Sequence, residues 1–143
     1  AAAAFYVCYF VFGENAVTAG FYGATGAIIG HDFPFFHHFK GGKGIAAMLG
    51  MMLGAFPFPA LIVYIIAIAV LMSGYVSLTS LVLSVLIPIS LSIWHYPTEV
   101  VVLTSALALL AFIQHRQNIK RLINGTESRF DIIGKLKPKK KER

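Results

Sequence analysis

The sequence has little charge and almost no cysteine. Only 13% of its 143 residues are charged, whereas 57% are hydrophobic and the mean hydropathy is +0.75. A soluble domain of this length cannot bury that much apolar surface, so lipid must be the solvent for most of it. The single cysteine, Cys8, excludes a disulfide framework and a thiolate metal cluster. We therefore predict an all-α integral membrane protein built as a polytopic helix bundle.

The motifs of two enzyme classes are also missing. There is no GxSxG turn and no serine before Ser73, which argues against a serine hydrolase. No histidine is followed by aspartate five residues later, so the HxxxxD box of many soluble-headed acyltransferases is absent. The neighbouring His37 and His38 should point apart, and Asp32 is the only carboxylate near them. We expect neither a metal site nor a cofactor.

Positive charge is confined to two parts of the chain. Lys40 and Lys43 are the only Lys or Arg residues before Arg116, and the other ten lie from Arg116 to Arg143. Because cytoplasmic segments collect Lys and Arg, both clusters should face the cytoplasm. That requires an even number of crossings between them. Four apolar segments meet this condition: residues 44–58, 60–72, 76–94 and 100–113.

The two ends of the chain complete the predicted organisation. Residues 16–30 read as another helix, and residues 1–12 as the end of a helix whose start is missing, since a span needs about 20 apolar residues. We expect about five full transmembrane helices plus the end of a sixth, in a chain truncated at its N-terminus. Residues 1–130 would form the membrane domain. Residues 131–143 would form a basic, disordered cytoplasmic tail that faces lipid and not nucleic acid.

The run GHDFPFFHHFKGGKG, residues 30–44, indicates an anion site. It places Lys40 and Lys43 among Gly41, Gly42 and Gly44, between two apolar segments. A glycine-rich backbone can turn its N–H groups toward phosphate oxygens, because glycine reaches backbone angles that other residues avoid.

A second polar cluster, HRQNIKRL followed by GTE, begins at His115. If the last helix continues past residue 113, His115 and Asn118 share one of its faces. A solvated basic cap on a membrane helix would explain the positive charges alone. Asn118 and Glu127 favour a site, since neither helps to bind an anionic membrane.

These segments resemble a known family. FPFFHHFKGGKGIA, after Gly30 and His31, resembles the GHxFPxFxxFKGGKGVA signature of the bacterial membrane glycerol-3-phosphate acyltransferases that use acyl phosphate, the PlsY family. HRQNIKRLINGTESR resembles the family's HRxNIxRLLxGxExK signature, and YVSLTS, residues 75–80, resembles its YVSLAS segment. The three matches occur in the family's order and cover nearly the whole chain.

The resemblance implies a fold and a reaction. The family has seven membrane helices, of which this chain would keep the end of the second and all of the third to seventh. The reaction would transfer a fatty acyl group from acyl phosphate to the 1-hydroxyl of glycerol 3-phosphate, giving lysophosphatidate for phospholipid synthesis. It would take place on the cytoplasmic side of the bacterial inner membrane, where the C-terminus also lies. A soluble phosphate acyltransferase that forms acyl phosphate would be a partner. The family's GSGNxGATNxxR signature is absent, so we expect the 143-residue chain alone to be inactive.

The matched signatures also imply roles for single residues. Lys43, His115, Asn118 and Glu127 would be catalytic, with Glu127 ordering the loop around the site. Phosphate and acyl phosphate would be bound by a set of seven residues: His31, Lys40, Gly41, Gly42, Lys43, Gly44 and Arg116. For His31, a helix-capping or backbone-bonding role is an equal alternative.

Two other functions remain open. A small-anion transporter would also use short, glycine-broken helices around cations, but it needs polar residues in mid-span, and residues 60–72 and 100–113 offer no charged group there. A membrane-anchored adaptor with a basic tail would leave the KGGKG glycines unexplained.

Overall fold

All the regular elements in the part that can be described are helices. The computed structural model describes residues 1–37 and 41–130, and within these ranges it contains no strand. The elements are α1 (Ala2–Val11), η1 (Gly13–Asn15), α2 (Ala16–Asp32), η2 (Phe35–His37), α3 (Ile45–Ala55), α4 (Pro57–Leu71), α5 (Val76–Ile93), α6 (Thr98–Gln114) and α7 (Arg116–Ile123). The predicted all-α architecture is confirmed. The predicted tail, residues 131–143, and Lys40 lie outside the described residues.

The helices end near the predicted breaks, with one difference: the break between residues 44–58 and 60–72 lies at Phe56 and not at residue 59, because α4 already begins at Pro57. Pro57 is the first residue of α4, a position where its missing N–H costs nothing. Gly74 takes a left-handed conformation, φ +84°, in the turn between α4 and α5. The turn before α6 combines His95, at φ +55°, with Pro97 as the N-cap.

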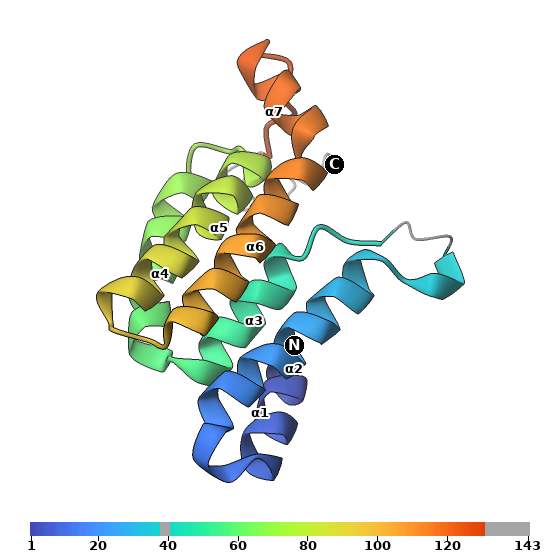
Figure 1. The fold of residues 1–143 in the computed structure, drawn as a ribbon. Coiled ribbons are helices and arrows are strands. Elements are labelled where there is room, and N and C mark those ends of the chain that lie inside the picture. Colours follow the sequence, from blue (N-terminus) through green and yellow to red (C-terminus); the bar gives the residue numbers. More distant parts are fainter. Residues whose placement is uncertain (38–40, 131–143) are drawn as a thin grey trace, which may run out of the picture.

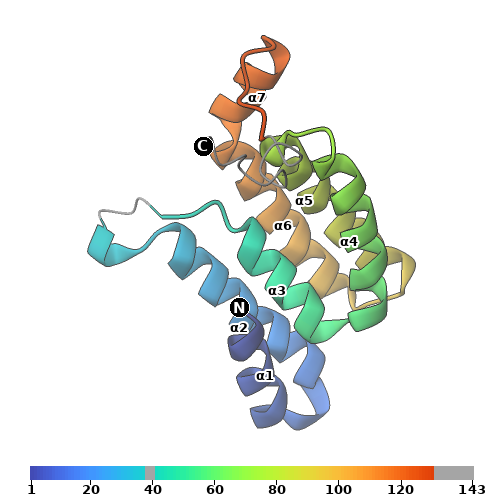
Figure 2. The ribbon, with the colours of Figure 1, turned by 180° about the vertical axis from the view of Figure 1, so that it is seen from behind.

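Consecutive helices from α2 to α6 run in alternating directions (Figure 1). The α1–α2 pair stands at one side, α4, α5 and α6 stand at the other, and α3 lies between them, as the view from behind also shows (Figure 2). Four helices separate the loop after α2 from α7. That loop and α7 therefore lie toward the same end of the bundle.

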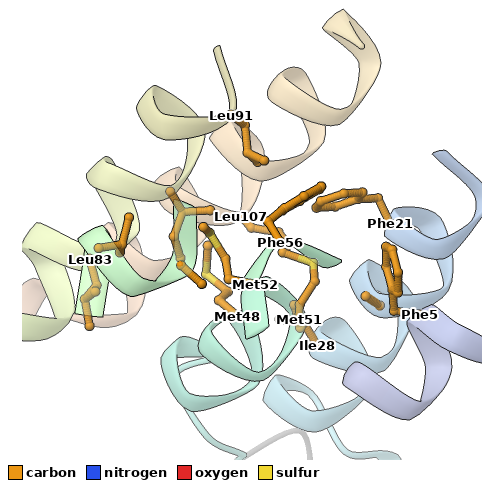
Figure 3. Close-up of a cluster of buried hydrophobic side chains, with 14 of the residues drawn as sticks. Phe5, Phe21, Ile28, Met48, Met51, Met52, Phe56, Leu83, Leu91 and Leu107 are labelled. Atoms are coloured by element: carbon orange, nitrogen blue, oxygen red, sulfur yellow. The ribbon is translucent and has the colours of Figure 1, made fainter. Parts of the chain in front are cut away.

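Helix α3 forms the centre of the core. Met48, Met51 and Met52 are almost completely buried and contact side chains from both sides of the bundle (Figure 3). Phe21 of α2 stacks on Phe56, at the end of α3, with ring centroids 5.3 Å apart. Flexible methionine side chains fill irregular gaps between helices. The start of α3, and the glycine loop that leads into it, is thus fixed to a well-packed core.

The outer faces are apolar, as expected where lipid is the solvent. On α4, for example, Leu61, Ile65 and Ile68 are more than half exposed. Among the described helices, α5 alone is long and apolar enough to cross a membrane as one helix, and the bent pair α6–α7 would be a second if it counts as one span. Helices α1, α3 and α4 are apolar but shorter. The number of spans stays a prediction.

The last helix continues one residue past 113, to Gln114, and then bends, so His115 and Asn118 do not lie on one straight helix. Helices α6 and α7 are bent by 61° at His115. Polar side chains take up the carbonyls at the end of α6: His115 Nδ1 lies 2.8 Å from Ala111 O, and Arg116 donates to Ile113 O. Both carbonyls also accept backbone N–H bonds at this helix end, so the side-chain bonds are additional contacts at the bend.

Candidate active site

A cavity of about 860 Å³ lies where α3, α5 and α7 meet. Its polar wall carries His31, Lys43, His115, Asn118 and Glu127, and its apolar wall carries residues such as Leu49, Leu71 and Leu83. This volume is typical of a site for a small molecule or cofactor.

A chain of hydrogen bonds joins the two predicted clusters across this cavity. Lys43 Nζ donates to Asn118 Oδ1 at 2.5 Å, although the residues are 75 positions apart. Asn118 Nδ2 donates to Glu127 Oε1 at 2.7 Å, and Arg121 Nε donates to Glu127 Oε2 at 2.6 Å. The structure thus brings together Lys43, Asn118 and Glu127, three of the four residues predicted to be catalytic, and the fourth, His115, lines the same cavity.

The Glu127 carboxylate sets the orientation of Asn118. Its hydrogen bonds from Asn118 and from the Arg121 guanidinium lower its pKa from an ordinary value of 4.5 to about 2. An ionised carboxylate can only accept hydrogen bonds, so it holds the amide nitrogen of Asn118. The amide oxygen therefore faces Lys43. An ammonium has three N–H donors, and Asn118 takes one of them.

The glycines of the loop lie against the end of α2. Gly42 N–H donates to His31 O at 3.3 Å. A Cβ on Gly41 would overlap His31 O, and one on Gly42 would overlap the His31 ring. Gly44, the N-cap of α3, is buried and left-handed at φ +71°. Close packing alone thus explains why glycine occupies all three positions.

The other predicted residues fall in different places. His31 lines the cavity, and its main-chain carbonyl accepts from Gly42 N–H. Neither observation tests the roles predicted for its side chain, so these stay predictions. Gly44 also lines the cavity, whereas Gly41 and Gly42 are not among its lining residues. Arg116 is exposed and bonded to the end of α6, away from the lining. Lys40 lies outside the described residues. The phosphate-binding roles stay predictions.

Several residues near the site were not assigned from the sequence. Ser77, Thr79 and Ser80 line the cavity from α5, and their signal was present in the YVSLTS match. Asp32, at the end of α2, is only 4% exposed and accepts from Gln114 Nε2 at 3.2 Å and from the backbone of Gly44. A single aspartate after a helix gives no signal of this kind in a sequence.

The segment after α7 closes one side of the cavity. Residues 126–130, here called the return segment, run from α7 back to the turn before α5. Phe130 N donates to Gly74 O at 2.7 Å, and the Arg129 guanidinium lies 5.0 Å from the centre of the Tyr75 ring. Ser128, Arg129 and Phe130 all line the cavity.

No group of three or more His, Cys, Asp or Glu side chains is placed to hold a metal ion within residues 1–37 and 41–130. The side-chain donors at the cavity include an ammonium, a guanidinium, imidazoles, an amide and hydroxyls. These groups suit an anionic substrate with polar oxygens.

The sequence profile of one family, described as glycerol-3-phosphate acyltransferase, matches residues 1–125. Curated relatives carry the same name. One from Allorhizobium ampelinum is 42% identical over 127 residues, covering 87% of this chain and 59% of the relative. One from Brucella anthropi is 39% identical over 122 residues, covering 85% and 58%. The chain spans about three fifths of the length of these relatives.

Solved structures agree with the sequence matches. The crystal structure of PlsY (YgiH), an integral membrane glycerol 3-phosphate acyltransferase, in its glycerol 3-phosphate form superposes with a TM-score of 0.80 and 29% identity. The match covers 94% of this chain and 67% of that one. The lysophosphatidic acid form superposes with a TM-score of 0.77 and 30% sequence identity. This match covers 89% of this chain and 65% of that one. The predicted class, an all-helical integral membrane protein, is confirmed, and the chain belongs to the glycerol-3-phosphate acyltransferase family.

Proposed function

We propose that the protein containing this chain transfers a fatty acyl group from acyl phosphate to the 1-hydroxyl of glycerol 3-phosphate. The product would be lysophosphatidate, for phospholipid synthesis. The observation that carries the proposal is the bond from Lys43 to Asn118, which joins two motifs of the family at one cavity. The glycerol 3-phosphate and lysophosphatidic acid forms of the solved relative support the choice of acceptor and product.

The two walls of the cavity suit an amphiphilic substrate. Lys43 and His115 stand on the polar wall, while Leu49, Leu71 and Leu83 offer apolar surface for a fatty chain. An acyl phosphate has an anionic head and an acyl chain, so it matches both walls at once. Glycerol 3-phosphate would fit beside the head, where the remaining polar side chains lie.

The chemistry needs no nucleophile from the protein, because phosphate is a good leaving group. The 1-hydroxyl oxygen bonds to the acyl carbon, the bond from that carbon to the phosphate oxygen breaks, and the hydroxyl proton leaves with the phosphate. Lys43 would stabilise the negative charge that develops on the oxygens, and His115 and Asn118 would align glycerol 3-phosphate. Glu127 would hold Asn118 in place, without contact to the substrate.

We further propose the bacterial inner membrane as the location, with the active site and the C-terminus on the cytoplasmic side. The alternating directions of α2 to α6 support this topology, because they bring the two cationic segments to one end of the bundle (Figure 1). A soluble enzyme that supplies acyl phosphate would act from the same side. Cysteines placed near Lys120 and near Thr98 should be labelled by impermeant reagents from opposite sides of the membrane.

Transport of a small anion is the weaker candidate. Polar groups within the described helices are used locally: Tyr64 of α4 donates to Leu49 O, and Thr104 and Ser105 of α6 donate to carbonyls of their own helix. No row of polar groups therefore leads away from the cavity along α4 or α6. An adaptor role leaves the close packing of the KGGKG loop without a purpose.

The deciding experiment is an acyl-transfer assay on the purified full-length protein. Glycerol 3-phosphate is offered with either palmitoyl phosphate or palmitoyl-CoA, and lysophosphatidate is measured. We expect product from the acyl phosphate alone. Product from acyl-CoA alone, or glycerol 3-phosphate uptake into vesicles without acylation, would contradict the proposal.

A further inference from the structure

One buried carboxylate has no place in the chemistry above. Asp32 ends α2, is 4% exposed and is not among the residues that line the cavity. Within residues 1–37 and 41–130 the only ion pair joins Arg121 and Glu127, so Asp32 is held by neutral donors. A buried carboxylate is costly unless it is bonded. Asp32 Oδ1 has no hydrogen-bond partner among the described residues, so the carboxylate is held through Oδ2.

The two donors to Asp32 come from the segments that carry the site. Gln114 Nε2, at the end of α6, lies 3.2 Å from Asp32 Oδ2, and the backbone of Gly44 bonds to the same carboxylate. Gly44 directly follows Lys43, Gln114 directly precedes His115, and Asp32 directly follows His31. One carboxylate therefore ties together the three chain segments that place the cationic and imidazole groups around the cavity.

The contact with Gly44 leaves little room for movement. A Cβ on Gly44 would lie 2.7 Å from Asp32 Oδ2 and 3.2 Å from Ile28 Cγ2, so the carboxylate is packed directly onto the backbone there. Gly44 N-caps α3, whose methionines form the centre of the core. The position of Lys43 is thus set from one side by Asp32 and from the other by Asn118.

We propose that Asp32 is a positioning residue, which fixes Lys43 and His115 relative to each other through its hydrogen bonds to Gly44 and Gln114. The proposal rests on the proposed acyl transfer for its kinetic consequence. A displacement of about 1 Å in a catalytic group can cost about 100-fold in rate. The function of the carboxylate lies in its two accepted bonds.

The test compares Asp32→Ala with Asp32→Asn in the full-length protein. Asparagine keeps an oxygen for Gly44 N–H, and its amide nitrogen can donate to Gln114 Oε1, a buried atom without a hydrogen-bond partner among the described residues. Alanine removes both bonds. We expect Asp32→Ala to lower kcat/KM for glycerol 3-phosphate by about 100-fold, mostly through kcat, and Asp32→Asn to restore most of that loss. Glu99→Ala, which removes an exposed carboxylate at the other end of α6, is the matched control and should change nothing.

A second readout does not depend on the reaction. Trypsin cleavage after Lys43, followed by mass spectrometry in detergent, should be faster in Asp32→Ala than in the parent and in Asp32→Asn. If the parent makes no lysophosphatidate, the proposed function fails, while the cleavage rates still decide the positioning role. Parental kinetics or a parental cleavage rate in Asp32→Ala would overturn the proposal, as would Asp32→Asn being as impaired as Asp32→Ala. If Asp32→Ala does not fold, Gln114→Leu removes one of the two bonds and should show a smaller loss in the same direction; no loss there also overturns it.

Discussion

The two halves of the candidate site are held in place by different means. The glycine loop, residues 41–44, is held by backbone hydrogen bonds and by close packing against the end of α2. The other half, residues 115–130, is held by hydrogen bonds between polar and charged side chains, centred on Glu127. Added side-chain volume should therefore destabilise the loop half, and altered charge should destabilise the α7 half.

The difference follows from what lies behind each half. The loop leads into α3, whose methionines are almost completely buried in the core. Helix α7 has eight residues, none of them buried, so it cannot be fixed by apolar packing. Hydrogen bonds between polar side chains hold α7 in place, whereas apolar packing in the core holds α3 in place.

The largest effect is expected where the two halves meet. Lys43→Met removes the charge and the bond to Asn118, so turnover should fall by at least about 100-fold, the loss typical of removing one charge-stabilising group. Thermal stability in detergent should change little, because Lys43 is exposed. Lys120→Met, an exposed lysine of α7 outside the cavity lining, is the control and should retain activity. Activity retained in Lys43→Met would remove this residue from the site.

The loop half is tested next by adding one methyl group. Gly44→Ala forces a side chain into a left-handed backbone and against the Asp32 carboxylate, which should cost about 1–3 kcal/mol of stability. Gly50→Ala, on the same helix, meets no atom within 4 Å and has no left-handed strain. Chemical denaturation in mixed micelles should separate the two variants. Equal stability would mean that the loop is not held by close packing.

The α7 half is tested by charge. Glu127→Gln keeps the shape of the side chain but loses the charge-assisted bond from Arg121. Because the Arg121 side chain is 47% exposed, the free energy of unfolding should fall by only about 1 kcal/mol. Because the pKa of Glu127 is about 2 when folded and 4.5 ordinarily, its stabilisation is complete above pH 4.5 and fades as the pH falls toward 2. Hydrogen exchange of residues 116–130 should accelerate over that window in the parent. In Glu127→Gln the exchange should be faster at neutral pH and less dependent on acid; identical profiles would contradict this account.

The smallest effect is expected at the return segment. Tyr75→Leu removes the ring beneath Arg129, a contact worth about 0.5–1 kcal/mol at an exposed site. The backbone bond from Phe130 to Gly74 stays, so residues 128–130 should exchange only slightly faster. Tyr75→Phe keeps the ring and should match the parent. If hydrogen exchange is accelerated as much in Tyr75→Phe as in Tyr75→Leu, the effect is due to the hydroxyl group and not to the ring.

Most of the fold could be predicted from the sequence because proline, glycine and polar residues clearly separate its apolar segments. Pro57 begins α4 and Gly74 lies in the turn before α5, and the predicted segment 76–94 differs from α5 by one residue. Pro59 lies within the first turn of α4 and ends no helix. The bend at His115 could not be predicted. The pattern HRQNIKRL is compatible with a straight helix, and nothing in its spacing indicates the contacts that His115 and Arg116 make with carbonyls of α6 at the bend.

The site could be predicted as two motifs but not as a connected structure. Charge and glycine in residues 40–44, and the HRxN pattern, identified groups that share one cavity. The Asp32–Gln114 bond joins residues 82 positions apart, each a single polar residue at a helix end. Spacing along the chain gives no reason to pair two such residues.

The contact between His115 Nδ1 and Ala111 O bears on the chemistry of the imidazole. A carbonyl oxygen can only accept, so the hydrogen of this contact must sit on Nδ1. In the neutral ring, Nε2 then carries the lone pair. The imidazole is thereby held in one tautomer before any substrate arrives, and a hydroxyl group that meets Nε2 in the cavity would do so as a donor.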